Sequence, residues 1–111
     1  MEPGPEDLKI ITLARSSRAR VAAAEGAAVR DETGRTYAAA AVALPSLKLS
    51  ALRLAVAMAV SSGAASLEAA ALVSDAGAVD PADLAVVREV GPSAVVFHAG
   101  ANGMLREVLV P

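Results

Sequence analysis

Apolar and polar residues alternate along the 111-residue chain in patterns that switch between helical and extended intervals. From Glu6 onward apolar residues recur at nearly the helical interval, and the acidic Glu6 and Asp7 suit a helix N-terminus. This pattern predicts a first helix that ends between Arg15 and Arg20. We expect the preceding proline-rich residues 1–5 to form a flexible tail.

The next segment, residues 25–44, has two apolar runs on either side of the sequence DETG at residues 31–34. This pattern predicts a β-hairpin in which Gly34 supplies the positive φ of the turn. Pro45 then interrupts the apolar pattern. The serine that follows it is a suitable N-cap for a long apolar helix over Ser46–Gly63.

The second half of the chain contains three further apolar runs of strand length, separated by a helical pattern. LEAAALVSD at residues 67–75 predicts a buried strand. AVVFHAG at residues 94–100 and MLREVLV at residues 104–110 predict two more, joined by a tight Asn-Gly turn. Between the first and the second of these strands, PADLAVVREV at residues 81–90 predicts a helix with the preceding aspartate as its N-cap.

The predicted elements follow the order α-β-β-α-β-α-β-β within a single domain, residues 6–111. The middle β-α-β-α-β portion requires parallel strands with right-handed crossovers, whereas the two hairpins add antiparallel edges. The sequence therefore predicts an α/β fold with three layers, α-β-α, around a five-stranded mixed sheet.

The composition narrows the classes of function. The chain is 55% hydrophobic, carries a formal net charge of −2 and has no cysteine. The charge lacks the basic excess of a general nucleic-acid binder, and a chain without cysteine has no disulfides and no thiolate chemistry. The longest apolar runs are shorter than the ~20 residues of a membrane-spanning helix, and no signal-peptide pattern opens the chain. We therefore expect a cytoplasmic protein without membrane or nucleic-acid partners.

Five segments occur in an order and spacing typical of one enzyme family. They are GAAVRDETGRTY, LSALRLAVAMAVSSG, ALVSD, VDPADLAVVREV and ANGMLREVLVP. The first resembles a hairpin that opens with a VGAA-type strand, the second a helix of the LCAER type that ends in SEG, and the fourth a PCGxCRQ helix. Over nearly its whole length the chain thus resembles the zinc-dependent cytidine deaminases. The resemblance implies their fold, and an activity in which zinc-bound hydroxide attacks C4 of cytosine while a glutamate moves the proton.

The residues at the family's chemical positions depart from this pattern. The resemblance places the first zinc ligand on Ser50, the catalytic glutamate on Leu52, and the other two ligands on Ala82 and Ala85, after the retained Pro81. A serine hydroxyl is a poor zinc ligand, alanine offers no ligand atom, and leucine cannot carry a proton. We therefore expect no zinc, no other cofactor and no catalytic residue at these positions.

The sugar-binding segment of the family, NVEN, corresponds to Ala41-Val42-Ala43-Leu44, and the chain has only two aromatic residues with which to stack a pyrimidine. We expect at most a vestigial pocket, closed by Leu52 and the two alanines that replace ligands. Its expected members are Ala41, Ala43, Ser50, Leu52, Pro81, Ala82 and Ala85.

Other chemically active side chains are few. His98 is the only histidine and has apolar neighbours, which favours a packed residue over a metal ligand or a base. Without a base nearby in the sequence, Ser50 is a weak candidate nucleophile. Asp75, Asp80 and Asp83 fit two interpretations: helix caps and turns, or a hard-cation site at the pocket mouth.

The basic residues also fit two interpretations. Arg15, Arg18 and Arg20 suit the C-terminal end of the first helix and a solvated face, and they also fit a phosphate or RNA contact. Arg53 corresponds to the arginine of the family's CAER motif, and together with Lys48 it flanks the degenerate helix. We interpret Arg53 as structural.

The predicted helix Ser46–Gly63 is apolar on nearly all sides, as expected of a helix that is buried on more than one side. Because one sheet covers only one side of it, we expect the other side to contact a second subunit or an unknown protein partner. The resemblance likewise implies a homo-oligomer, tetramer or dimer, that associates through this helix.

Three hypotheses of function follow. The first is a catalytically inactive cytidine-deaminase-like protein that acts as a homo-oligomeric binding or scaffolding module. The second is a receptor that binds a nucleoside or another small metabolite in the vestigial pocket. The third, and weakest, is an active nucleoside deaminase or hydrolase with a relocated site.

Overall fold

A computed structural model describes all 111 residues, and its helices and strands alternate largely as the sequence predicts. In chain order the elements are α1 (Pro5–Arg20), β1 (Glu25–Asp31), β2 (Thr36–Ala40), β3 (Val42–Leu44), β4 (Leu47–Leu49), α2 (Ala51–Ser61), β5 (Leu67–Ser74), α3 (Pro81–Val90), β6 (Val95–Ala99) and β7 (Leu105–Leu109). None of the three helices combines the length and the apolarity needed to cross a membrane.

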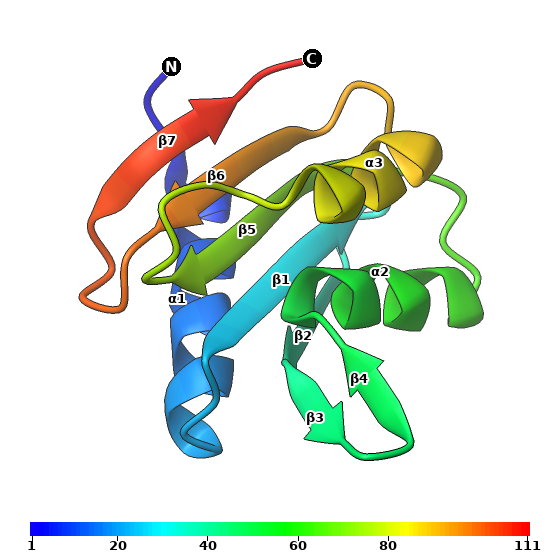
Figure 1. Cartoon of the computed structure of the whole chain (residues 1–111). Coiled ribbons are helices and arrows are strands. Elements are labelled where there is room, and N and C mark those ends of the chain that lie inside the picture. The colour runs from blue at the N-terminus through cyan, green and yellow to red at the C-terminus, as the bar shows by residue number, and fades with distance from the viewer.

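The main sheet has five strands in the order β2-β1-β5-β6-β7 (Figure 1). β5 and β6 pair in parallel, whereas the β1–β2, β1–β5 and β6–β7 pairs are antiparallel. The predicted turn of the first hairpin is confirmed, with Gly34 at a φ of 87°. The sheet is therefore the mixed five-stranded sheet that the sequence predicts.

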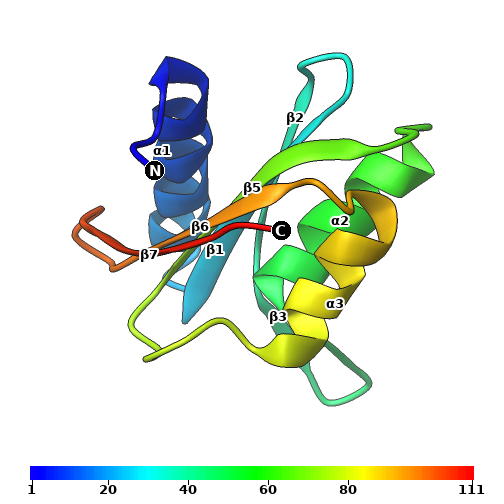
Figure 2. The same cartoon turned by 90° about the horizontal axis from the view of Figure 1, so that it is seen from above.

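Helices cover both faces of this sheet, which confirms the three-layer α-β-α arrangement. α1 packs on one face and α2 and α3 on the other (Figure 2). On the α1 face, Ile10 and Phe97 belong to one cluster of buried side chains. On the opposite face, Leu52 and Val56 of α2 belong to a second cluster, into which Val87 of α3 also packs.

The contact between α1 and β1 depends on the absence of a side chain at Gly26. A Cβ atom at this position would lie 2.8 Å from the backbone nitrogen of Arg18 and closer still to the carbonyl oxygen of Ala14. Glycine therefore lets the helix and the strand approach more closely than any other residue would. This contact fixes the position of the first layer against the sheet.

The predicted helix Ser46–Gly63 is wrong at its N-terminal end. α2 begins at Ala51, and the residues before it form the short β3–β4 hairpin, a separate two-stranded sheet. The Pro45-Ser46 pair forms the turn of this hairpin, since proline and serine suit tight turns as well as helix starts. Ser50 is the true N-cap, because its hydroxyl oxygen accepts a hydrogen bond from the Arg53 N–H at 3.2 Å.

Candidate functional site

A cavity of about 580 Å³ lies where the first turns of α2 and α3 meet the sheet. Its polar lining consists of Glu25 from β1, Ser50 and Arg53 from the start of α2, and Asp80 and Asp83 from the start of α3. The rest of the wall is apolar and includes residues of the loop between β5 and α3. The volume is within the usual range of small-molecule sites.

The two helix N-termini at this cavity are each capped by a side chain and joined by a hydrogen bond. Ser50 caps α2, and the Asp80 carboxylate caps α3 by accepting a hydrogen bond from the Ala82 N–H at 2.9 Å. The Ser50 hydroxyl also donates to Oδ1 of Asp83 at 2.9 Å. The first turns of α2 and α3 are therefore connected directly through their side chains.

Asp83 is the buried acid of the site, with 9% of its side chain exposed. Besides the Ser50 hydroxyl, its Oδ1 contacts Nε of Arg53 at 3.3 Å. Burial of a carboxylate is costly unless a counter-charge or hydrogen bonds compensate for its lost hydration, and here both are present. Arg53, which we interpreted as structural, thus pairs with an aspartate of the neighbouring helix and also lines the cavity.

Glu25, the first residue of β1, is a member of the site that the sequence analysis missed. Its Oε1 accepts a hydrogen bond from the Ala51 N–H at 3.0 Å, so that it adds a negative charge at the N-terminus of α2. The sequence did contain a signal. Glu25 stands where the VGAA-type strand of the resembling family has an apolar residue, and an acid at such a position requires a polar partner.

The structure brings together only some of the residues of the predicted vestigial pocket. Ser50, Pro81 and Ala82 line the cavity. Leu52 is fully buried in the core against the sheet, and Ala85 is exposed on α3 outside the cavity lining.

The alanines of the NVEN-like segment also lie outside the cavity lining, and Ala43, on the β3–β4 hairpin, is exposed. Ala41, at the start of this segment, is half-buried. We expected Leu52, Ala82 and Ala85 to close the pocket, whereas the structure has an open cavity that Ala82 lines and that Leu52 and Ala85 do not.

The residues at this site do not fit the zinc ion that the resemblance implies. A zinc centre needs three or four side-chain nitrogen, sulfur or carboxylate ligands arranged around the ion. The Ser50 hydroxyl is already used by α2 and Asp83, and Ala82 and Ala85 carry only methyl groups. Moreover, no group of three histidine, aspartate or glutamate side chains is placed to hold a metal ion.

The three aspartates considered for a cation site do not come together. Asp80 and Asp83 line the cavity, whereas Asp75 does not. Asp75 instead forms ion pairs with Arg18 at 3.7 Å and Arg106 at 3.5 Å. The structure therefore does not place the three aspartates together as a hard-cation site.

Two of the three arginines at the end of α1 contact neighbouring loops. Nε of Arg18 donates to the carbonyl oxygen of Ala24, and Nε of Arg15 donates to the carbonyl oxygen of Ala101. These contacts tie the end of α1 to the chain around it, in keeping with the structural interpretation.

His98 is fully buried on β6, as a packed histidine would be. Its Nε2 lies 2.9 Å from the hydroxyl oxygen of Ser74, which is 3% exposed, while its Nδ1 has no hydrogen-bond partner. Both side chains are therefore packed in the interior of the fold.

A second, shallower hollow of about 390 Å³ runs along the outer side of α2. Leu54, Ala57 and Met58 of the helix line it together with Tyr37 of β2. The Tyr37 hydroxyl donates to Oδ2 of the buried Asp31 at 2.9 Å. Burial is the main cause that raises the pKa of Tyr37, and the bond to Asp31 adds to the effect.

Comparison with known proteins agrees with this architecture. The sequence model of the cytidine deaminase-like family matches residues 3–103. Among solved structures, cytidine deaminase from Burkholderia pseudomallei superimposes with a TM-score of 0.75 at 23% sequence identity, over 92% of this chain and 90% of that one, which establishes a shared fold. No curated protein sequence matches the chain. On the extent of the family match, the chain belongs to the cytidine deaminase-like family.

Proposed function

We propose that the chain is a catalytically inactive cytidine-deaminase-like protein that acts as a homo-oligomeric binding or scaffolding module. The observation that carries the proposal is the Ser50–Asp83 hydrogen bond. At the position matched to the first zinc ligand, the side chain is used to cap α2 and to join it to α3. A hydroxyl in this role is not available as a ligand for a zinc ion, and without the ion no bound water is activated.

The position matched to the catalytic glutamate supports the same proposal. Leu52 is fully buried and packs in the apolar cluster between α2 and the sheet. General acid–base catalysis requires a group that gains and loses a proton within hydrogen-bond reach of the substrate. A leucine in the core meets neither requirement.

The outer side of α2 supports the oligomeric part of the proposal. Met58 and Val60 are 37% and 50% exposed, and the β3–β4 hairpin adds Leu44 and Leu47, which are about half exposed. Large exposed apolar side chains are enriched at subunit contacts, and these four lie on α2 and on the hairpin directly before it. The small side chains between them allow a second copy of the chain to approach closely.

Turnover and zinc content test the inactive site. The purified chain, dialysed and then incubated with cytidine or deoxycytidine and added zinc, should form no uridine product and retain far less than one zinc ion per chain. The Burkholderia pseudomallei cytidine deaminase, assayed in parallel, serves as the positive control. Product formation that a chelator abolishes and zinc restores would disprove the proposal.

Light scattering over a range of protein concentrations tests the oligomer. Met58→Glu places a charge on the outer side of α2 and should shift the wild-type oligomer to monomer. Leu8→Glu is the matched control, because Leu8 is also an exposed helix residue, 52% accessible, but lies on α1. A monomeric wild type, or equal dissociation by both variants, would contradict an interface on α2.

A second candidate function is a receptor for a nucleoside or another small metabolite. The open cavity of about 580 Å³ favours it, because the chain has retained space and polar groups where the closed-pocket hypothesis expects apolar filling. A ligand that binds only the folded state raises the thermal midpoint. A panel of nucleosides and other metabolites, screened for such a shift, tests this function separately from turnover.

A further inference from the structure

The carboxylates of the cavity use only some of their oxygens within the protein. Oε1 of Glu25 accepts from the Ala51 N–H, and Oδ1 of Asp80 accepts from the Ala82 N–H. The structure contains no hydrogen bond to Oε2 of Glu25 or to Oδ2 of Asp80. Both residues line the cavity, so it offers acceptors that the protein itself does not use.

Asp83 shows the same imbalance in a buried position. Its Oδ1 bonds to Ser50 and Arg53, whereas Oδ2 has no partner in the structure. The side chain is nine-tenths buried and lines the cavity. Oδ2 is not among the buried side-chain atoms without a partner, so this oxygen is accessible and can accept a hydrogen bond from a donor in the cavity.

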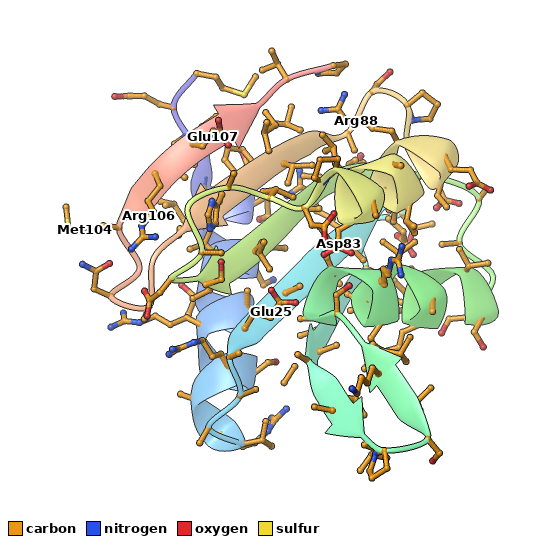
Figure 3. The ribbon with its side chains drawn as sticks, viewed as in Figure 1. Glu25, Asp83, Arg88, Met104, Arg106 and Glu107 are labelled. Carbon is orange, nitrogen blue, oxygen red and sulfur yellow. The ribbon has the colours of Figure 1, made fainter.

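The charge of the lining determines which kind of donor fits. Glu25, Asp80 and Asp83 bring three carboxylates, and Arg53 brings the only positive side chain, which already pairs with Asp83. An excess of two negative charges remains. Figure 3 shows Glu25 and Asp83 converging on the space between β1 and the two helices. Because Ser50 and Ala51 are consecutive residues, the bonds that they make hold these two carboxylates close to each other.

The size and the walls of the cavity favour an organic ligand over a metal ion. About 580 Å³ is many times the volume of one ion, and no three acidic or histidine side chains are placed to coordinate one. Leu72 of β5, Val79 and Pro81 add an apolar wall beside the carboxylates. Such a site suits a compact apolar body with a charged end.

We infer that the cavity between α2 and α3 binds a small organic cation, a primary ammonium, amidinium or guanidinium compound with a compact apolar body. The cationic end donates hydrogen bonds to Oδ2 of Asp83 and Oε2 of Glu25, and the apolar body packs against Leu72 and Val79. Charge-assisted hydrogen bonds of this kind are about twice as strong as neutral ones. This inference rests on the receptor function proposed above and names its class of ligand.

Isothermal titration calorimetry with charged and neutral probes of equal shape tests the inference on the full chain. Benzamidine and phenethylamine are the cations, and benzamide and 2-phenylethanol are their neutral counterparts. We expect each cation to bind at least about tenfold more tightly than its counterpart, because only the cation pairs with the unbonded carboxylate oxygens. The preference should shrink as salt concentration rises.

A pair of variants assigns the binding to this cavity. Glu25→Gln removes one charge but keeps an amide oxygen that can accept from the Ala51 N–H, so the hydrogen bond between β1 and α2 is retained. It should weaken binding of the cations by about tenfold. Glu32→Gln is the matched control, because Glu32 also accepts hydrogen bonds from backbone N–H groups, at residues 65 and 66, but lies outside the cavity. It should bind the cations as the wild type does.

The outcomes separate this inference from the function on which it rests. Equal affinity for charged and neutral probes, or equal affinity of the two variants, would overturn the inference. Binding of cytidine without binding of either cation would overturn it and leave the receptor function standing. If no nucleoside and no cation bound, both the inference and the receptor function would be overturned. Calcium chloride alone, if it bound the wild type and not Glu25→Gln, would replace the organic cation with a metal ion.

Discussion

The two faces of the sheet differ in how completely they are filled. On the α1 face, Ile10 and Phe97 are buried in an apolar cluster, and Gly26 lets the helix contact the strand directly. Both cavities lie on the other face, beside α2. That face also holds the buried Asp83 with its partners Ser50 and Arg53.

This difference separates the part of the molecule that stabilises the fold from the part that leaves room for a ligand. Asp83 is nine-tenths buried, whereas its partner Arg53 is about half exposed. The ion pair and the hydrogen bond from Ser50 compensate for the lost hydration of the Asp83 carboxylate. The α2–α3 face therefore keeps polar groups beside an open cavity.

The largest expected effect lies on the α1 face. Gly26→Ala forces the added methyl group against backbone atoms of α1, which cannot move aside as a flexible side chain could. Overpacking of this kind should lower the free energy of unfolding by about 3 kcal/mol. Urea denaturation measures the loss, and Gly77→Ala is the control. A Cβ atom at Gly77 meets nothing within 4 Å, so a change of at most about 0.5 kcal/mol is expected there.

If Gly26→Ala proved as stable as the wild type, the α1 layer would have to be able to shift on the sheet. The comparison between a tightly packed face and an open one would then fail.

Removal of the Asp83 carboxylate should have the next largest effect. Asp83→Ala leaves the Ser50 hydroxyl and the Arg53 guanidinium without their shared partner, and we expect a loss of about 2 kcal/mol in the free energy of unfolding. Asp83→Asn keeps an acceptor for Ser50 and should lose less. The matched control is Asp75→Ala, which breaks two exposed ion pairs and an exposed hydrogen bond from the Ala101 N–H, and it should cost at most about 1 kcal/mol.

Measuring the thermal midpoint with added zinc tests whether Asp83 is a metal ligand. Since the side chains of Ser50 and Asp83 connect the two helices without a metal, added zinc should leave the thermal midpoint of the wild type unchanged. A zinc-dependent rise in the midpoint that disappears in Asp83→Ala would instead make Asp83 a metal ligand.

The third effect lies at the start of α2, where substitutions of two serines four residues apart can be compared. Ser50→Ala removes the N-cap and the donor to Asp83, so we expect a loss of about 1–2 kcal/mol. Ser46→Ala alters an exposed turn residue and should change the stability by no more than about 0.5 kcal/mol. Thermal unfolding of both variants measures the difference. The opposite ranking would support the helix start at Ser46 that the sequence predicts.

The two serines also illustrate what could be predicted from the sequence. Apolar periodicity located the three helices and five of the strands, because each buries a continuous stripe or face whose spacing is local. The start of α2 could not be located in this way, since Ser46 and Ser50 are both good caps. The choice depends on Glu25, a residue 26 positions away that bonds to Ala51.

The candidate site was predictable only where it corresponds to the family. Ser50, Pro81 and Ala82 were identified by their positions in motifs, and they do line the cavity. The bond from Glu25 to Ala51 and the pairing of Asp83 with Arg53 join segments far apart in the sequence, and the motifs identify neither contact. These contacts depend on how three elements meet in space, which the spacing along a single chain does not give.

The turn between β1 and β2 carries a buried acid of a different kind from Asp83. The Asp31 carboxylate accepts hydrogen bonds from the hydroxyl and N–H of Thr33, the N–H of Arg35 and the hydroxyl of Tyr37. These bonds, above all the one from the Thr33 hydroxyl, lower the pKa of Asp31 from 3.8 to about 2, although burial opposes the shift. The ionised form is therefore favoured in the folded state.

The last effect is a pH dependence of stability that is confined to acid. Because the pKa of Asp31 is lower in the folded state than in the unfolded state, its contribution to stability is complete above pH 3.8 and is lost as the pH falls toward 2. Urea denaturation at several pH values should show the wild type losing stability faster over this interval than Asp31→Asn, which has no proton to bind there. Asp75→Asn, altered at an exposed carboxylate, should keep the wild-type slope. Equal slopes for all three proteins would mean that the turn opens before Asp31 is protonated, and that the α2 face is less firmly held at this edge of the sheet than its hydrogen bonds indicate.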